Sequence, residues 1–119
     1  MDIKIEQGAV KRILIPVTDA NGDPVDLTKI PGICWTYGRR KGYPGDLLKK
    51  PGDPGCEIVT DKTDHPEAEN NALQVMLTAE ETRIAAGNIY YHAAWAMSID
   101  GPILIVQGAI KIEATVWCE

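Results

Sequence analysis

The chain of 119 residues is short enough for one domain and long enough to bury a core without a metal or disulfide. Its net charge of −5 argues against non-specific nucleic-acid binding, and its 45% hydrophobic content is ordinary for a globular protein. No apolar run approaches the roughly 20 residues of a membrane span, and the first residues do not resemble a secretory signal. We therefore expect a single domain over residues 1–119, made in a bacterial cytoplasm, with neither membrane nor nucleic acid as a partner.

The cysteines predict neither a disulfide framework nor a metal site. Cys34, Cys56 and Cys118 are an odd number, and no two are closely spaced. Because cytosolic thiols stay reduced, we expect three free thiols.

Two strands and a tight turn are predicted in the first part of the chain. Residues 2–6 and 10–17 alternate apolar and polar side chains, which is the period of a half-buried strand. Pro16 cannot donate a hydrogen bond to a neighbouring strand, so an edge position or a bulge is expected there. Asn21-Gly22 then predicts a hairpin turn, since both residues tolerate a positive φ.

A third strand is predicted over residues 33–39. The side chains on one of its faces are Ile33, Trp35 and Tyr37. Residues 42–55 contain three prolines and four glycines, a density that predicts a surface loop. A short strand over residues 57–60 and a polar loop over residues 61–71 are expected to follow.

The next segment predicts a strand that runs into a capped helix. Residues 73–78 alternate, and Thr78 followed three residues later by Glu81 is a capping box. The box predicts a short helix over residues 79–86 that ends at Gly87. So short a helix is unstable alone, so we expect Ile84 to fill one end of the core.

The last third of the chain predicts a long hairpin that turns at Asp100-Gly101. In its first strand, His92 and Trp95 lie on opposite faces. Its second strand alternates most cleanly from Ala109 to Val116. About seven short strands separated by turns indicate an all-β, immunoglobulin-like antiparallel β-sandwich with one short helical turn near residues 79–86.

The sequence shows no catalytic or metal-binding motif. Its only serine, Ser98, lies in no nucleophile motif, and no glycine-rich phosphate loop is present. His65 precedes a proline in a polar loop, and His92 is expected at the surface or at an interface. The chain is therefore expected not to be an enzyme and to need no cofactor.

The turn near residue 21 partly resembles a calcium loop. Asp19, Asn21 and Asp23 match its first three ligand positions, but Pro24 replaces the glycine and Ile30 replaces the bidentate glutamate. A hairpin turn rich in Asp and Asn accounts for the same residues, so no metal is expected.

Candidate contact residues are chosen by residue type and expected exposure. The basic residues 39–41, with Lys49 and Lys50, suit either an acidic partner or a solvated strand end. A tryptophan near the end of the chain is expected to fold back on the sandwich or to pack on another subunit. The predicted interface residues are His92, Trp117, Arg39, Arg40, Tyr43, Leu47 and Leu48.

Three segments resemble a family of small immunoglobulin-like domains of tailed bacteriophages and prophages, the amino-terminal domain of BppU-type upper baseplate proteins. They are the hairpin VTDANGDPVDLT, the segment LQVMLTAEETRIAAGNIYYHAAW, and the closing hairpin through Asp100-Gly101 with QGAIKI. They cover about half of the chain in the family's order. The chain departs from the family in its proline-rich residues 42–55 and in His92, where the family often has Asp.

The resemblance implies a structural protein of a virion. We expect a small adaptor or decoration module that self-associates and docks on a symmetric tail, baseplate or major capsid assembly. The alternative is a module that binds a glycan or small ligand on a platform of Tyr43, Tyr90 and Trp117. An enzyme is the least favoured class.

Overall fold

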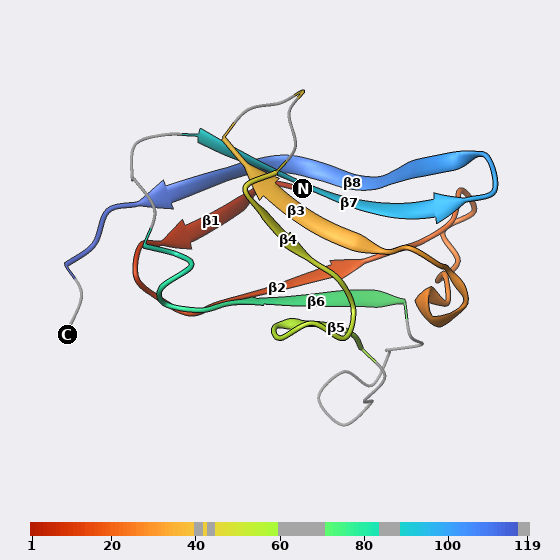
Figure 1. Ribbon diagram of the computed structural model, residues 1–119, viewed down its shortest axis with the longest axis horizontal. Helices are drawn as coiled ribbons and strands as arrows, with labels where there is room; N and C mark the ends of the chain where they lie inside the picture. Colours follow the sequence, from red (N-terminus) through yellow and green to blue (C-terminus); the bar gives the residue numbers. More distant parts are fainter. Residues whose placement is uncertain (40–41, 43–44, 60–70, 84–88, 117–119) are drawn as a thin grey trace.

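The protein is a sandwich of two β-sheets (Figure 1). The computed structural model describes residues 1–39, 42, 45–59, 71–83 and 89–116. One sheet has five strands in the order β1-β8-β7-β3-β4, and the other has three in the order β2-β6-β5. The strands are β1 (Ile3–Glu6), β2 (Lys11–Pro16), β3 (Cys34–Gly38), β4 (Leu47–Lys49), β5 (Cys56–Ile58), β6 (Ala72–Leu77), β7 (Ile89–Ser98) and β8 (Gly101–Glu113), with a short 3-10 turn η1 (Leu27–Lys29).

The strand order is that of an immunoglobulin variable-type domain and confirms the predicted fold class. In chain order, β2 to β8 take the places of strands B, C, C′, D, E, F and G. Trp35 on β3 is fully buried, at the strand on which such domains carry their core tryptophan. Apolar residues of both sheets surround it, among them Ile5, Ile15, Leu73, Val75 and Ile110.

The alternating segments form strands as predicted, except that β8 ends at Glu113 and not at Val116. The edge position of Pro16 is confirmed. Pro16 ends β2, an outer strand of the three-stranded sheet. The Asn21-Gly22 turn is also confirmed. Gly22 has a φ of 85°, and its N–H donates to the Asp19 carbonyl at 3.0 Å.

Two features of the sheets differ from the prediction. First, β1 pairs with β8 in parallel, so the sandwich is not wholly antiparallel. Second, residues 42–55 are not all loop, because β4 lies within them and pairs with β3. Three residues between glycine- and proline-rich flanks are too few to show an alternation, so only pairing with β3 identifies this strand.

The predicted helix is not formed over the described residues, which contain a single turn at residues 79–82. The capping box is present: the Thr78 N–H donates to Glu81 Oε1 at 2.9 Å, and the Glu81 N–H donates to Thr78 Oγ1 at 3.1 Å. The next bond, from the Arg83 N–H to the Glu80 carbonyl, already has 3-10 spacing. Ile84 and Gly87 lie outside the described residues. No helix in the described part of the chain could cross a membrane.

Candidate interaction surfaces

His92 lies in the core, so its predicted place at the surface or at an interface is wrong. Its side chain is 3% exposed. The indole N–H of Trp35 donates to His92 Nδ1 at 3.3 Å, and His92 Nε2 lies 2.6 Å from the Met1 carbonyl oxygen. The face of β7 that carries His92 is therefore the buried one, and Trp95 lies on the opposite, partly exposed face.

These contacts favour a neutral imidazole. Because Nδ1 accepts a hydrogen bond from Trp35, the ring proton is on Nε2 and is donated to Met1. Burial lowers the pKa of His92 below its ordinary value, and this effect outweighs the opposing hydrogen bond to Met1. His92 is thus a structural link between β3, β7 and the start of the chain.

Gly108 on β8 makes room for this link. It stands opposite His92 in the sheet, and a Cβ atom there would lie 1.8 Å from the Met1 carbonyl oxygen. The residues beside it complete the attachment of the amino-terminal segment. The Met1 amino group donates to the Gln107 carbonyl at 2.9 Å, and the Ala109 N–H donates to Asp2 Oδ1 at 3.0 Å.

The predicted basic cluster is divided by the fold. Lys49 is buried, and its ammonium group lies 3.1 Å from Glu81 Oε1 and 3.2 Å from the Pro54 carbonyl. Arg39 is exposed and lies 3.6 Å from an Asp46 carboxylate oxygen. Lys49 is therefore committed to an internal ion pair, and only Arg39 and Lys50 among the described basic residues of this cluster face solvent.

The remaining predicted contact residues have mixed outcomes. Leu48 is exposed, whereas Leu47 is half-buried and packs on the core. Tyr90 is buried beside Tyr37, so it is not available for the glycan platform. The other predicted residues, Arg40, Tyr43 and Trp117, lie outside the described part of the chain.

The Asp-rich turn holds its own backbone. Asp19 Oδ1 accepts hydrogen bonds from the N–H groups of Asn21 at 2.8 Å and Asp23 at 3.0 Å. Among the described residues there is no group of three or more His, Cys, Asp or Glu side chains placed to hold a metal ion. Cys34 and Cys56 are free thiols, and Cys118 lies outside the described residues.

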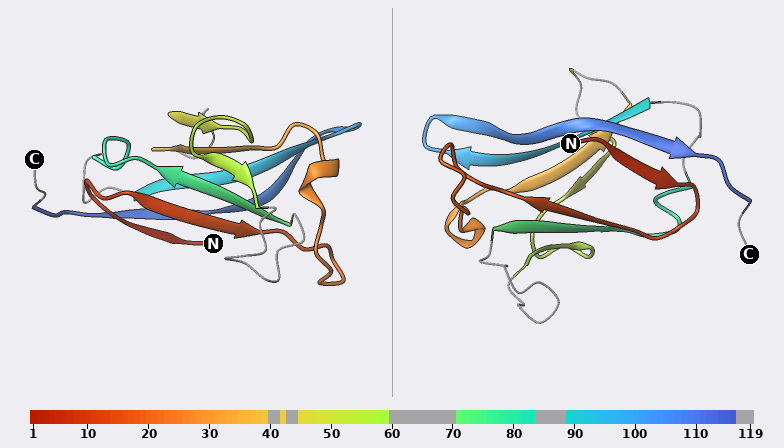
Figure 2. Two further views of the ribbon diagram at one scale, coloured as in Figure 1. Left: turned by 90° about the horizontal axis from the view of Figure 1, so that it is seen from below. Right: turned by 180° about the vertical axis from the view of Figure 1, so that it is seen from behind.

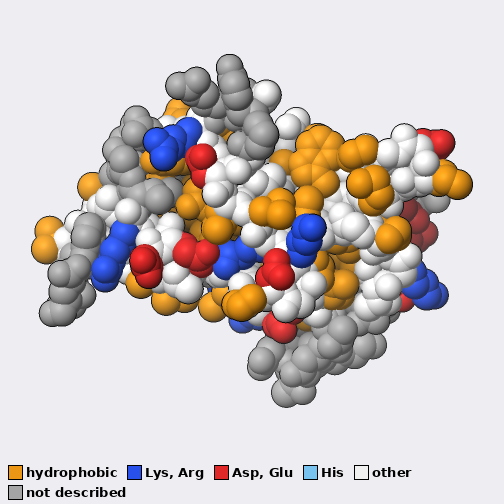
Figure 3. Space-filling view, in the orientation of Figure 1, with side chains coloured by type: hydrophobic (Ala, Val, Ile, Leu, Met, Phe, Trp, Pro, Cys, Tyr) orange, Lys and Arg blue, Asp and Glu red, His pale blue; other side chains and the backbone are white. Residues whose placement is uncertain are grey.

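The main apolar surface is the far end of the β7–β8 hairpin, which runs past the ends of β2 and β6 (Figures 1 and 2). We call it the apolar hairpin end, and its residues are Met97, Ile99, Ile103 and Leu104. Met97 and Ile103 are 47% and 54% exposed, and Ile99 in the turn is 101% exposed. Figure 3 shows hydrophobic side chains gathered over this end of the molecule.

A sequence signal for this surface existed and was missed. Asp100 is the only charged residue between Ile89 and Ile110, whereas 24% of the whole chain is charged. A hairpin in the middle of a sandwich buries one face and presents a polar one to water. Here both faces lack charged side chains. The fold requires only one apolar face, so the second one indicates an interaction surface.

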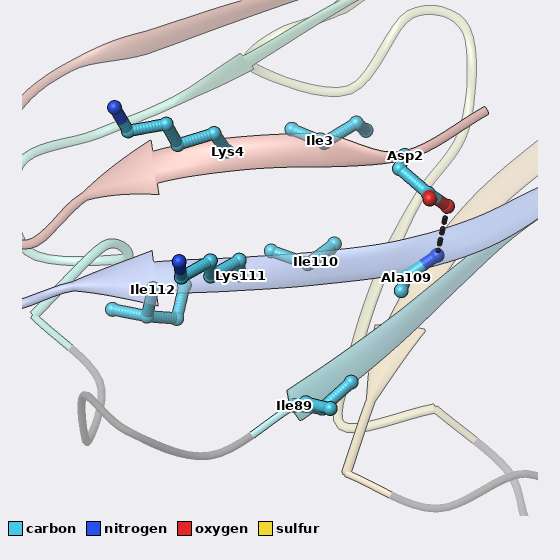
Figure 4. Close-up of a pocket in the computed structure, with 8 residues that line it drawn as sticks. All are labelled: Asp2, Ile3, Lys4, Ile89, Ala109, Ile110, Lys111 and Ile112. Carbon is cyan, nitrogen blue, oxygen red and sulfur yellow. Dashed lines mark hydrogen bonds between the residues drawn. The ribbon is translucent and has the colours of Figure 1, made fainter.

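A concave surface lies along β1, β8 and the start of β7 (Figure 4). We call it the β1–β8 groove. It has a volume of about 470 Å³ and is lined by Asp2, Ile3, Lys4, Ile89, Ala109, Ile110, Lys111 and Ile112. Ile89 is exposed, and Lys4 forms an ion pair with Glu113 at 3.2 Å. The groove is mainly apolar, and its charged lining residues are Asp2, Lys4 and Lys111.

The chain matches no protein-family model, and no curated protein matches it significantly.

Proposed function

We propose that this protein is a non-enzymatic structural protein of a bacteriophage virion, a small adaptor or decoration module that docks on a symmetric tail, baseplate or capsid assembly. The order of its three family-like segments supports the virion context. The immunoglobulin-like sandwich is the scaffold that this resemblance implies.

The observation that carries the docking function is the apolar hairpin end. Four large apolar side chains are exposed there on a rigid ladder, and the turn itself presents Ile99 where turns ordinarily carry polar residues. Exposed apolar surface of this kind marks interaction sites, and interface centres lose charged residues while gaining Met and aromatic side chains. Symmetric repetition would convert such a small contact into stable attachment.

The hairpin is also built to keep its shape when it docks. Ser98 Oγ donates to the Gly101 carbonyl at 2.8 Å and accepts from the Asp100 N–H at 3.1 Å, which closes the turn. The Met97 N–H donates to the Pro31 carbonyl at 3.0 Å and ties the hairpin to the segment before β3. A pre-organised surface loses little conformational entropy on binding.

The test is the composition of purified virions. Mass spectrometry is expected to find the protein in particles of its phage, at a copy number that fits their symmetry. Met97→Lys with Ile103→Lys is expected to remove it from the particles while its thermal unfolding is retained. Val10→Lys, an equally exposed apolar position on the β1–β2 turn, is the matched control and should be incorporated normally. Absence of the wild-type protein, or normal incorporation of the hairpin variant, would overturn the proposal.

A further inference from the structure

We infer that the apolar hairpin end of one copy inserts into the β1–β8 groove of a second copy, so that copies join head to tail. This contact rests on the proposed function in that it gives the same hairpin end a partner. It can nevertheless be measured on the purified protein alone. One protruding and one concave surface of the described chain form it.

The apolar hairpin end has the shape of a plug rather than of a flat face. Ile103 pairs with Ala96, the neighbour of Met97, so Met97 and Ile103 lie on opposite faces of the hairpin. The turn between the strands carries exposed Ile99 and Asp100. Because the hairpin runs past the ends of β2 and β6 (Figures 1 and 2), the other sheet does not cover it. A protruding segment that is apolar on both faces and at its tip fits a concave site.

The β1–β8 groove offers room and an available cation. Its volume of about 470 Å³ lies in the range of roughly 300–1,000 Å³ that is typical of ligand sites. Of its charged residues, Lys4 is paired with Glu113, and Asp2 accepts the Ala109 N–H. Lys111 is exposed and has no ion pair among the described residues. An incoming acid would therefore find its partner in Lys111.

The turn and the groove match each other in residue type and order. In the groove, Ile89 is the ladder partner of Lys111, so an exposed apolar side chain and a cation stand side by side (Figure 4). In the turn, Ile99 and Asp100 place an exposed apolar side chain beside an acid. Contact of Ile99 with Ile89 would bring Asp100 to Lys111, and opposite charges of this kind fix the register of an interface.

Another apolar cavity of the described chain lacks this match. It has a volume of about 510 Å³ and lies beside Val10 and Met76. Its lysine, Lys49, is already paired with Glu81 at 3.1 Å. Among the described residues that line this cavity, no unpaired cation remains for Asp100. The charge of the turn therefore selects the β1–β8 groove.

The two surfaces can meet only between copies, because they lie at opposite ends of one hairpin. Ile89 begins β7, and the turn follows its last residue, Ser98. The ten residues of β7 span about 30 Å, and their pairing with β8 keeps the two ends apart. Because plug and groove are different surfaces, the contact is heterologous, and its repetition gives a ring or a filament. A contact made by one hairpin end is small, so free copies should associate weakly.

The first experiment measures mass against protein concentration under reducing conditions. The wild-type chain is expected to form concentration-dependent oligomers. Ile99→Asp in the plug and Ile89→Asp in the groove should each weaken the association at least about tenfold. An equimolar mixture of the two variants should form dimers and nothing larger, because it retains one intact plug and one intact groove. Leu48→Asp, at an exposed apolar position on the opposite edge strand β4, is the matched control and should associate like the wild type.

The second experiment exchanges the charges of the contact. Asp100→Lys and Lys111→Asp should each weaken the association about tenfold, because each places like charges together. The two substitutions in one chain should restore it. The double variant carries the same change in the turn as Asp100→Lys, so its recovery separates the charge from any effect on the turn. Lys50→Asp, just beyond β4, is the control for the change of charge.

Three results would overturn the inference: a wild-type chain that stays monomeric up to about 1 mM, a mixture of the Ile99→Asp and Ile89→Asp variants that associates no better than either alone, or a charge exchange that restores nothing. A monomeric protein that is still found in virions would refute this contact and leave the proposed function intact. A protein that associates through this contact but is absent from virions would support the contact and overturn the proposed function.

Discussion

His92 is held by two hydrogen bonds, and only its neutral form can accept the one from Trp35. Protonation would place an N–H on Nδ1, where the Trp35 N–H already points, and would bury a charge. The folded protein therefore holds this proton less readily than the unfolded chain does. The resulting stability is complete above the ordinary pKa of 6.5 and decreases as the pH falls below it.

We expect this loss of stability between pH 7.5 and pH 5.5 to be removed by His92→Gln, whose amide can accept from Trp35 and donate to Met1. The free energy of unfolding in urea at each pH measures it. An equal slope in wild type and His92→Gln would show that His92 is not the group that titrates.

Buried Lys49 and partly buried Glu81 form an ion pair, and the two residues depend on it unequally. Glu81 also accepts the Thr78 N–H, whereas buried Lys49 has Glu81 as its only acidic partner among the described residues. Burial raises the pKa of Glu81, but the hydrogen bonds from Thr78 and Lys49 outweigh it and lower that pKa. This contribution to stability is lost only as the pH falls through the acidic range below the ordinary pKa of Glu81.

The asymmetry predicts unequal effects of substitution. Glu81→Ala should destabilise the protein by roughly 3 kcal/mol, because it leaves the Lys49 charge buried and unpaired. Lys49→Met should cost only about 1 kcal/mol, since Glu81 keeps Thr78 and contact with water. Urea unfolding of both variants measures the difference. Equal losses would mean that the Lys49 charge is well solvated without its partner.

The elements form where local chemistry and pairing agree. The Asn21-Gly22 turn needs only its own residues, because Gly22 has a φ of 85° and nothing lies within 4 Å of the position of its Cβ. The parallel pairing of β1 with β8, in contrast, requires residues more than 100 positions apart. Turn chemistry is therefore predictable from sequence, and long-range pairing is not.

The turn gives a prediction free of steric effects. Gly22→Ala should lower the free energy of unfolding by about 1 kcal/mol, the cost of a left-handed conformation for a residue with a Cβ. Gly22→Asn should cost less, because Asn tolerates this conformation. Thermal unfolding of the two variants measures the order. A larger loss for Asn than for Ala would contradict the conformational explanation.

The capping box shows how a correct local signal can serve another purpose. Both hydrogen bonds between Thr78 and Glu81 are present, but the described chain continues for only one turn. The carboxylate that closes the cap also receives the Lys49 ammonium group from β4. The motif therefore positions an acid for a tertiary contact, which no local pattern could reveal.

At the scale of the molecule, the two sheets close over one core. Cys56 on β5 is part of that core, and burial raises the pKa of its thiol to about 11. We expect iodoacetamide at pH 8 to label Cys34, which is partly exposed, well before Cys56. Peptide-resolved mass spectrometry separates the sites.

Because Cys56 is reached only when the sandwich opens, its labelling rate should follow global unfolding as urea is added. Cys34 should show little dependence on urea. Labelling of both cysteines at the same rate in buffer would show that β5 opens independently of the sandwich.

The sequence by itself determined the strands with clear alternation, the tight turns, the capping box and the all-β sandwich, because each depends on neighbouring residues or on a short period. Only the tertiary structure decided the features that depend on strand pairing and packing. These are the parallel β1–β8 pair, the strand β4, and the buried positions of His92, Tyr90 and Lys49. Alternation shows that the two faces of β7 differ, but not which one meets the other sheet. That choice placed His92 in the core, whereas the apolar hairpin end is exposed because the hairpin runs past the ends of β2 and β6.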